Sequence, residues 1–167
     1  MEHSEINCNL IIACRKGHEK AVLRDVMDLL FPSDPKVRGS ILSGGKLCVE
    51  TTLDLKSLGK LFRQYPIRNL LSIRAVMRSI EFPGDIITGI RELLKETCKD
   101  AVRFRRITIK IRASEGWRQE YFARIAETLR GCYGGYFEGV IEKEGSLLLL
   151  EIKIPLKWGN IAYYPEK

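Results

Sequence analysis

Apolar positions along the first half of the chain recur at strand spacing and then at helix spacing. Val22, Val26, Leu29 and Leu30 fall on one face of a helix and predict that this face is buried. The elements predicted for this half are a strand over 9–15, a helix over 17–31, a hairpin over 37–52, a helix from about 54 to 65 and an extended segment over 67–82. This order is that of the split βαβ, or ferredoxin-like, fold, in which two helices cover one face of an antiparallel sheet.

The hairpin turn contains the sequence Ser43-Gly44-Gly45-Lys46, which has two interpretations. Two glycines supply the positive φ that a tight hairpin turn requires. A glycine followed by a lysine also occurs in phosphate-binding loops, but the Walker pattern would need a glycine in place of Ser40 and a hydroxyl in place of Leu47. The incomplete pattern favours a plain turn, and a small nucleotide-binding enzyme that uses the 43–46 loop remains the alternative.

A second set of elements follows Phe82-Pro83-Gly84, a boundary that predicts domains over 1–82 and 83–167. Alternation over 103–114 predicts a strand with isoleucines on one face. The predicted elements are a helix over 85–99, that strand, a helix from about 118, the glycine pair 134–135 that ends this section, and a hairpin over 140–143 and 147–155. The two halves together predict an α+β protein with a ferredoxin-like sheet followed by a second α/β domain.

The chain has 167 residues, of which 45% are hydrophobic, so it is long enough to form a core in one domain or two small ones. No apolar run approaches the roughly 20 residues that span a bilayer. The N-terminal sequence MEHSEINCNL carries acidic residues and no apolar signal core. We therefore expect a cytoplasmic protein without a membrane partner.

The five cysteines are scattered without the spacing of a metal site or a disulfide framework. Cys8 and Cys14 are expected on one face of one strand, where six residues span about 20 Å, too far for a single tetrahedral zinc. Buried thiols in the core are the better interpretation. The sequence therefore predicts no disulfide framework, no metal and no cofactor.

The net charge of +7 and the sequence pI of about 9.2 favour a polyanionic partner, nucleic acid above all. Two stretches, 55–80 and 101–114, contain no acidic residue and several arginines and lysines. In the second stretch, Arg106, Lys110 and Arg112 alternate with isoleucines and should share one strand face. Basic residues aligned in this way can neutralise phosphates. The alternative is a solvated sheet face that binds nothing.

The extended segment over 67–82 carries a second predicted basic face, because Arg68, Arg74 and Arg78 have the same parity. Trp117 and Trp158 could stack on unpaired bases, although tryptophans in such positions are more often packing residues. RNA is the expected ligand, and no RNP, KH or zinc-finger motif accompanies the charge.

The second half of the sequence resembles the THUMP domain. The resemblance rests on RRITIKIRAS (105–114), an amphipathic helix, VIEKEGSLLLLEIKIP (140–155) with its Glu151-Ile152 step, and NIAYYP (160–165). In this family a ferredoxin-like domain precedes THUMP, as the first half predicts here. The segment NLIIACRKGHEKA (9–21) resembles the opening of stand-alone THUMP proteins related to the tRNA acetylation adaptor.

The resemblance implies tRNA binding, commonly through the acceptor stem and its 3′ end. In most members of the family a catalytic domain follows, but this sequence has no Rossmann G-x-G-x-x-G, no complete pyrophosphatase loop and no zinc-deaminase pattern. We therefore predict a non-catalytic tRNA-binding adaptor, not an enzyme, that presents tRNA to a separate modification enzyme. The partner that the resemblance suggests is a tRNA cytidine acetyltransferase.

The residues predicted to bind RNA are basic and lie on the predicted strands, at a helix start or at strand ends. They are Arg106, Lys110, Arg112, Arg118, Lys153, Lys157, Arg15 and Lys16. Lys153 shares parity with Glu151 and should point away from the core. Besides the nucleotide-binding enzyme, the remaining alternative is a protein-interaction module whose basic face meets an acidic partner.

Overall fold

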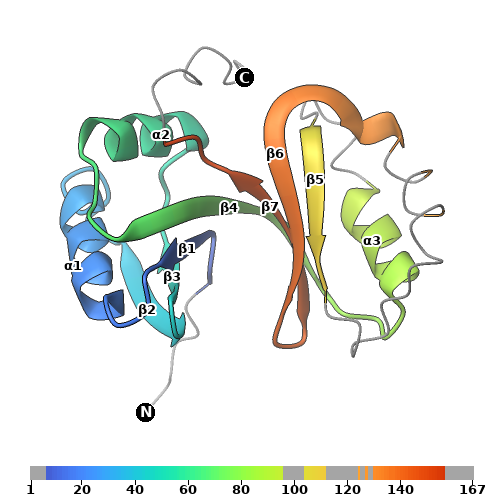
Figure 1. Cartoon of the computed structure of the whole chain (residues 1–167), viewed down its shortest axis with the longest axis horizontal. Coiled ribbons are helices and arrows are strands. Elements are labelled where there is room, and N and C mark those ends of the chain that lie inside the picture. Colours follow the sequence, from blue (N-terminus) through green and yellow to red (C-terminus); the bar gives the residue numbers. More distant parts are fainter. Residues whose placement is uncertain (1–6, 96–103, 112–123, 125–126, 128–129, 157–167) are drawn as a thin grey trace. The chain divides into compact units, whose positions relative to one another are not determined.

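Figure 1 shows a computed structural model of the chain, which describes residues 7–95, 104–111, 124, 127 and 130–156. The chain forms two compact units. The first comprises Met1–Ala75 and Ile154–Tyr164, and the second comprises Val76–Lys153 and Pro165–Lys167. The domain boundaries expected from the sequence, 1–82 and 83–167, stay a prediction.

The first unit has the ferredoxin-like order that the sequence predicts. Its strands follow the order β2-β3-β1-β4, and the pairings β2 to β3, β3 to β1 and β1 to β4 are antiparallel. The elements are β1 (Leu10–Cys14), α1 (Glu19–Leu30), β2 (Arg38–Ser43), β3 (Lys46–Glu50), α2 (Leu55–Gln64) and β4 (Leu70–Glu81), of which residues up to Ala75 belong to this unit. The predicted α+β fold class is therefore confirmed.

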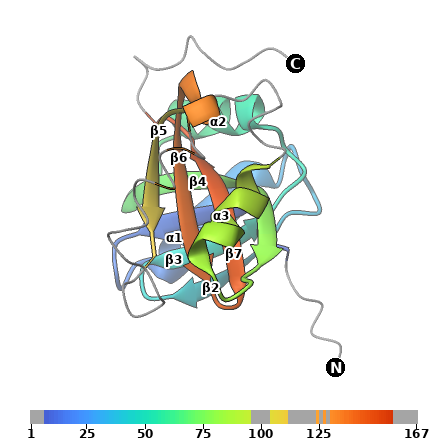
Figure 2. The same cartoon turned by 90° about the vertical axis from the view of Figure 1, so that its right-hand side faces the viewer.

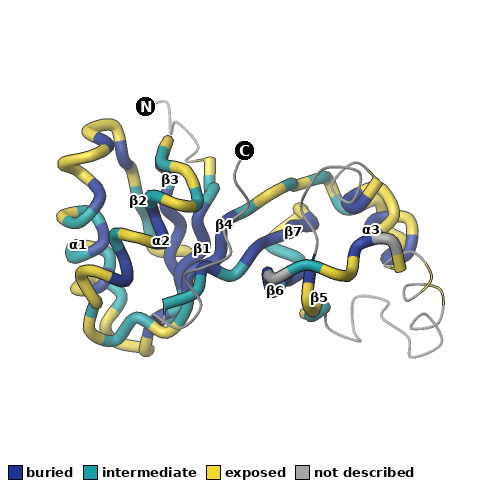
Figure 3. Tube along the Cα trace, turned by 90° about the horizontal axis from the view of Figure 1, so that it is seen from above, coloured by how far each residue is buried: buried dark blue, intermediate teal, exposed yellow. Residues whose placement is uncertain are grey.

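Alternation in β1 sets the core of this unit. Leu10 lies opposite Val49 on one neighbouring strand and Ala75 on the other, and Ile12 lies between Leu47 and Ile73 in the same way. All of these side chains are buried together with one face of each helix, and α1 alternates between buried and exposed residues along its length (Figure 3). The period of two in the strand and of 3.6 in the helix places both apolar faces in one core.

A buried carboxylate joins two connections of the first unit. The side chain of Asp34, in the loop between α1 and β2, accepts hydrogen bonds from Thr51 Oγ1 at 2.7 Å and from the Thr52 backbone N–H at 2.9 Å. Its other oxygen accepts from the backbone N–H of Lys36 at 3.2 Å. The Thr52 amide and the other donors hold the pKa of Asp34 below its ordinary value despite burial.

The 43–46 sequence is the turn of the β2–β3 hairpin, as the favoured interpretation predicts. Gly45 has a φ of 77°, and a Cβ there would lie 2.9 Å from the backbone oxygen of Cys14. Its backbone N–H donates to the Glu19 carboxylate at 2.8 Å. Phosphate-binding loops hold a phosphate through free backbone N–H groups. Because the Gly45 N–H is already bonded to Glu19, it is not available to a nucleotide.

The second unit combines the end of β4 with α3 (Ile86–Leu94), β5 (Phe104–Lys110), β6 (Tyr133–Glu144) and β7 (Leu147–Lys153). Its strand order is β4-β7-β6-β5, with β5 parallel to β6 and β6 antiparallel to β7. The glycine pair 134–135, expected to end the preceding section, lies inside β6, which begins at Tyr133. The strand runs through these glycines, but its pairing with β5 shifts register there, because Tyr133 and Phe137 both lie opposite Phe104.

Close backbone approaches explain two glycines of this unit. A Cβ on Gly139 of β6 would lie 2.9 Å from the ring of Phe104, which is fully buried. A Cβ on Gly89 of α3 would lie 2.9 Å from the Leu148 side chain, so the helix packs closely on β7 (Figure 2). In β7, the five consecutive residues from Leu148 to Ile152 are buried, so both faces of this strand are covered.

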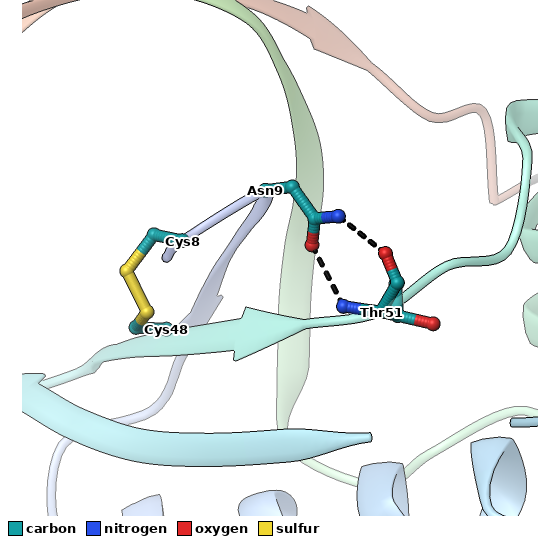
Figure 4. Close-up of a disulfide and its surroundings, with 4 residues drawn as sticks. All are labelled: Cys8, Asn9, Cys48 and Thr51. Atoms are coloured by element: carbon teal, nitrogen blue, oxygen red, sulfur yellow. Dashed lines mark hydrogen bonds between the residues drawn. A yellow bond between two sulfur atoms is a disulfide. The ribbon is translucent and has the colours of Figure 1, made fainter. Parts of the chain in front are cut away.

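The cysteines differ from the prediction. Cys8 lies just before β1 and forms a disulfide with Cys48 of β3, beside the paired hydrogen bonds between the Asn9 side chain and the Thr51 backbone (Figure 4). Cys132 is also disulfide-bonded. Cys14 is a free, buried thiol, as expected. The expectation of buried, unpaired thiols was wrong for Cys8, and Cys48 and Cys132 are disulfide-bonded as well, because pairing of β1 with β3 brings Cys8 and Cys48 together, which spacing along the sequence does not show.

Among the described residues, no helix is long and apolar enough to cross a membrane. Disulfides persist mainly in oxidising compartments and in intracellular proteins of hyperthermophiles. The cytoplasmic location therefore stays a prediction.

Replacing Asp34 with Asn should lower the free energy of unfolding by roughly 2 kcal/mol, because one side of the amide would present N–H groups to backbone or hydroxyl donors. Urea denaturation at pH 7 measures the change. Asp28→Asn is the control, since Asp28 is exposed on α1 and should shift the midpoint little. Equal midpoints for the two variants would show that the Asp34 hydrogen bonds add no stability.

Replacing Cys8 with Ser should destabilise the protein by roughly 3–4 kcal/mol, since the disulfide joins residues 40 apart in the sequence and restricts the unfolded chain. Thermal unfolding with and without a thiol reductant checks this. The reductant should destabilise the unsubstituted protein by more than the variant. A melting temperature that Cys8→Ser leaves unchanged would contradict the assignment of this bond.

Candidate nucleic-acid interface

The predicted basic strand is β5, which is the edge strand of the second unit. In β5, Arg105, Arg106 and Lys110 are exposed, whereas Ile107 and Ile109 are half-buried. Ile111, just past the strand, is buried. The exposure of Arg106 and Lys110 follows the predicted alternation, and Arg105 adds a further basic group that sequence reasoning left out.

Strand register places an acid among these bases. Parallel pairing puts Arg106 of β5 opposite Glu138 of β6, and antiparallel pairing of Gly139 with Ile152 puts Glu138 beside Lys153 of β7. The Glu138 carboxylate lies 2.7 Å from Arg105 Nη2, 3.6 Å from Arg106 Nη2 and 3.7 Å from Lys153 Nζ. We call these four residues the Glu138 cluster. Cross-strand neighbours of this kind interact directly.

The cluster holds Glu138 ionised. The hydrogen bond from Arg105 is the main cause that lowers the pKa of this carboxyl below its ordinary value, and the charges of Arg106 and Lys153 lower it further against the effect of burial. A hydrogen bond from a charged donor is stronger than a neutral one. The carboxylate on β6 therefore orients three cationic groups from the two neighbouring strands, β5 and β7.

The cluster retains capacity for an anion. The side chains of Arg105 and Arg106 are 67% and 66% exposed, and three cationic groups share one carboxylate. A guanidinium has five N–H donors, so one edge can face Glu138 while the other meets a phosphate oxygen. The arrangement suits binding of a polyanionic backbone rather than acid–base or nucleophilic chemistry.

The same face is less basic than the sequence of β5 suggests. Lys110 lies opposite Glu142, and the row that contains Thr108 and Val140 continues to Glu151. Glu142 and Glu151 are both buried. The stretch 101–114 lacks acids along the chain, but pairing with β6 and β7 brings acids alongside it, a neighbourhood that linear charge counting cannot detect.

The second predicted basic face is largely absent. Arg68 precedes β4 and is exposed, whereas Arg74 is buried and Arg78 is half-buried. Arg63, from the same acid-free stretch, is also buried, and its guanidinium donates to the Pro155 carbonyl at 3.5 Å. Arg63, Arg74 and Arg78 therefore pack against the protein itself, as long basic side chains often do, and do not form an exposed basic face.

The other predicted RNA-binding residues belong to the first unit or lie outside the described residues. Arg15 and Lys16 are exposed after β1, in the first unit. Those outside the described residues are Arg112, Arg118 and Lys157, together with Trp117 and Trp158. The structure thus brings together Arg106 and Lys153 of the predicted set, with Lys110 farther along β5. Glu138 was missed because nothing in the sequence gives the register of a parallel pair.

No protein-family model and no curated protein matches the sequence. Solved structures do match. They include TrmN from Thermus thermophilus (TM-score 0.59, 12% identity, 87% of this chain and 45% of that one). A predicted N6-adenine-specific DNA methylase from Listeria monocytogenes matches with a TM-score of 0.57 and 15% identity, over 87% of this chain and 40% of that one. SMU.472, a putative methyltransferase complexed with SAH, matches with a TM-score of 0.54 and 13% identity, over 89% and 42%.

At these identities the likeness establishes a shared fold, which is compatible with the THUMP-like α/β domain that the sequence resembles. This chain spans less than half the length of those three structures. The comparisons correct the prediction of a non-catalytic adaptor that is not an enzyme, because the fold recurs in proteins named as methylases and methyltransferases. They give no support to an acetyltransferase partner.

The pH dependence of stability should reveal the Glu138 cluster. Because the folded-state pKa of Glu138 is lowered, its ionised form adds stability above the unfolded pKa of about 4.3, and this stability is lost as pH falls through the folded pKa. Glu138→Gln should therefore cost roughly 1 kcal/mol at pH 7 and much less at pH 3.

Urea denaturation at both pH values measures this difference. Glu92→Gln on α3 is the control, since Glu92 is exposed and the variant should show no such change between the two pH values. A cost of Glu138→Gln that is the same at pH 7 and pH 3 would mean that its charge plays no part.

Proposed function

We propose that this chain is the RNA-binding part of a tRNA methyltransferase. Two observations support the proposal: the fold is shared with proteins named as methylases and methyltransferases, and cationic groups of β5 and β7 gather around Glu138 of β6 with both arginines exposed. The choice of tRNA comes from the THUMP resemblance. We also propose that the protein acts on tRNA in the cytoplasm.

The observation that carries the proposed binding role is the Glu138 cluster. Arg105 and Arg106 keep about two-thirds of their side-chain surface exposed while bonded to Glu138. Each such cation that meets a phosphate releases condensed counterions and makes binding depend on salt. Because backbone contacts position a nucleic acid without reading its bases, we assign this surface a positioning role.

Methyl transfer is a property of the enzyme as a whole in this proposal. The structures matched here are more than twice as long as the shared region, so the likeness assigns no methyl-donor site to the described residues. What the chain's own residues do is hold RNA through backbone contacts. The direct test of the proposed function is therefore RNA binding.

A gel-shift titration compares tRNA with duplex DNA of equal charge at low and moderate salt. We expect a clear preference for tRNA. The double substitution Arg106→Ala/Lys153→Ala should weaken tRNA binding and reduce the slope of log K against log salt by about 1.4 to 1.8, since two phosphate contacts are lost.

The matched control is Arg24→Ala/Lys36→Ala, which removes two exposed cations of the first unit, of which Arg24 is also paired with a carboxylate. It should bind tRNA as the unsubstituted protein does. Binding of an acidic protein with no binding of tRNA would overturn the proposed function and favour an interaction module instead.

A further inference from the structure

Two loops of the first unit are joined at one end of its sheet. The loop 15–18 follows β1, and the loop 65–69 connects α2 to β4. The Arg15 backbone N–H donates to the Asn69 carbonyl at 3.0 Å, and the Asn69 side-chain nitrogen lies 3.1 Å from His18 Nδ1. We call these paired loops the loop clasp.

The loop clasp is held by its own backbone. Asn69 has a φ of 67° and Gly17 a φ of 89°, both in the left-handed region that Asn and Gly tolerate best. The Gly17 N–H donates to the Glu19 carboxylate at 3.1 Å, and Ile67 packs against the core. A surface ordered before its ligand arrives loses less entropy on binding.

The side chains that the loop clasp presents are basic and aromatic. Arg15, Lys16, His18 and Arg68 are exposed, and the Tyr65 side chain at the end of α2 is 59% exposed. Neither loop contains an acidic residue. The next acid along the chain is Glu19. Its own backbone N–H is the main cause that lowers the pKa of its carboxyl, and hydrogen bonds from the Gly45 and Gly17 amides lower this pKa further. These donors partly offset the negative charge of Glu19.

These cations differ from those of the Glu138 cluster in one respect. Arg105, Arg106 and Lys153 share a carboxylate, whereas in the described part of the chain no ion pair engages Arg15, Lys16 or Arg68. Their charge is available in full to an incoming phosphate. Tyr65, in the same loop as Arg68, supplies an exposed ring on which an unpaired base can stack.

We propose that the loop clasp is a second RNA site, which takes one unpaired nucleotide with Tyr65 against its base and Arg15 and Arg68 against its phosphates. The site rests on the proposed RNA-binding function and gives it a preference that the Glu138 cluster cannot provide. A blunt duplex exposes only the outer face of its terminal base pair, whereas an unpaired base can leave the stack to reach Tyr65, so the site favours RNA with a single-stranded segment.

The test uses two RNA hairpins, one with a four-nucleotide single-stranded tail and one blunt-ended, in fluorescence anisotropy titrations. Tyr65→Ala should weaken binding of the tailed hairpin by roughly 5- to 50-fold and leave the blunt hairpin within about twofold. Tyr65→Phe keeps the ring and should bind both as before. Phe31→Ala, which removes another exposed aromatic side chain of this unit, is the matched control.

A second variant tests the phosphate contacts. Arg15→Ala/Arg68→Ala should weaken binding of the tailed hairpin and lower its salt slope by about 1.4, the value for two contacts to a single strand. Thermal unfolding confirms that each variant is folded.

The outcomes separate this site from the proposed function. Tailed-hairpin binding that survives Tyr65→Ala, alongside loss in Arg106→Ala/Lys153→Ala, would overturn the second site and retain the RNA-binding function. Equal losses of both hairpins in Tyr65→Ala would also overturn the stacking role. If the unsubstituted protein binds neither hairpin nor tRNA, the proposed function and this site both fail.

Discussion

The first unit depends on one constraint, that β1 must pair along both of its edges while one of its faces packs against the helices. A central strand has to satisfy backbone N–H and C=O groups on both sides, and β3 and β4 do this for β1. Leu10 and Ile12 fix the register of both partners, because a slip of one residue would turn these side chains away from the helices. The loop after β1, with Arg15 and Lys16, is positioned by that same register.

Polar groups complete what the apolar alternation begins. The backbone of Thr51 forms two hydrogen bonds with the Asn9 side chain, and the Thr51 hydroxyl donates to the Asp34 carboxylate. The start of β1, the end of β3 and the loop after α1 are therefore joined at this one residue. Each of these groups is partly or fully buried, and a buried donor without an acceptor is costly. The disulfide between Cys8 and Cys48 fixes the same entry covalently.

In the second unit, the arrangement of charge matters more than its amount. Glu138 orients three cationic groups that would otherwise repel one another, and it neutralises them only in part. Cationic groups held in place this way suit contacts with a phosphate backbone. The loop clasp of the first unit presents basic residues with no such carboxylate, so the two surfaces differ chemically, which suits different parts of one RNA.

The sequence by itself determined the element order of the first unit, the buried face of α1, the hairpin turn at Gly45 and the exposure of Arg106 and Lys110. These properties follow from periods of two and 3.6 and from turn chemistry, which act over a few residues. It also indicated the excess of positive charge, though not where that charge would be balanced. The helix expected from about residue 118 lies outside the described residues.

Only the tertiary structure decided which groups meet. Cys8 joins Cys48 across 40 positions of sequence, Glu138 faces Arg106 through a parallel pairing, and Arg74 is buried although its strand pattern suggested an exposed face. Contacts of this kind depend on strand order and register, which are set by how whole elements pack. Local sequence carries too little information about that packing, and linear patterns therefore located the charges without locating their partners.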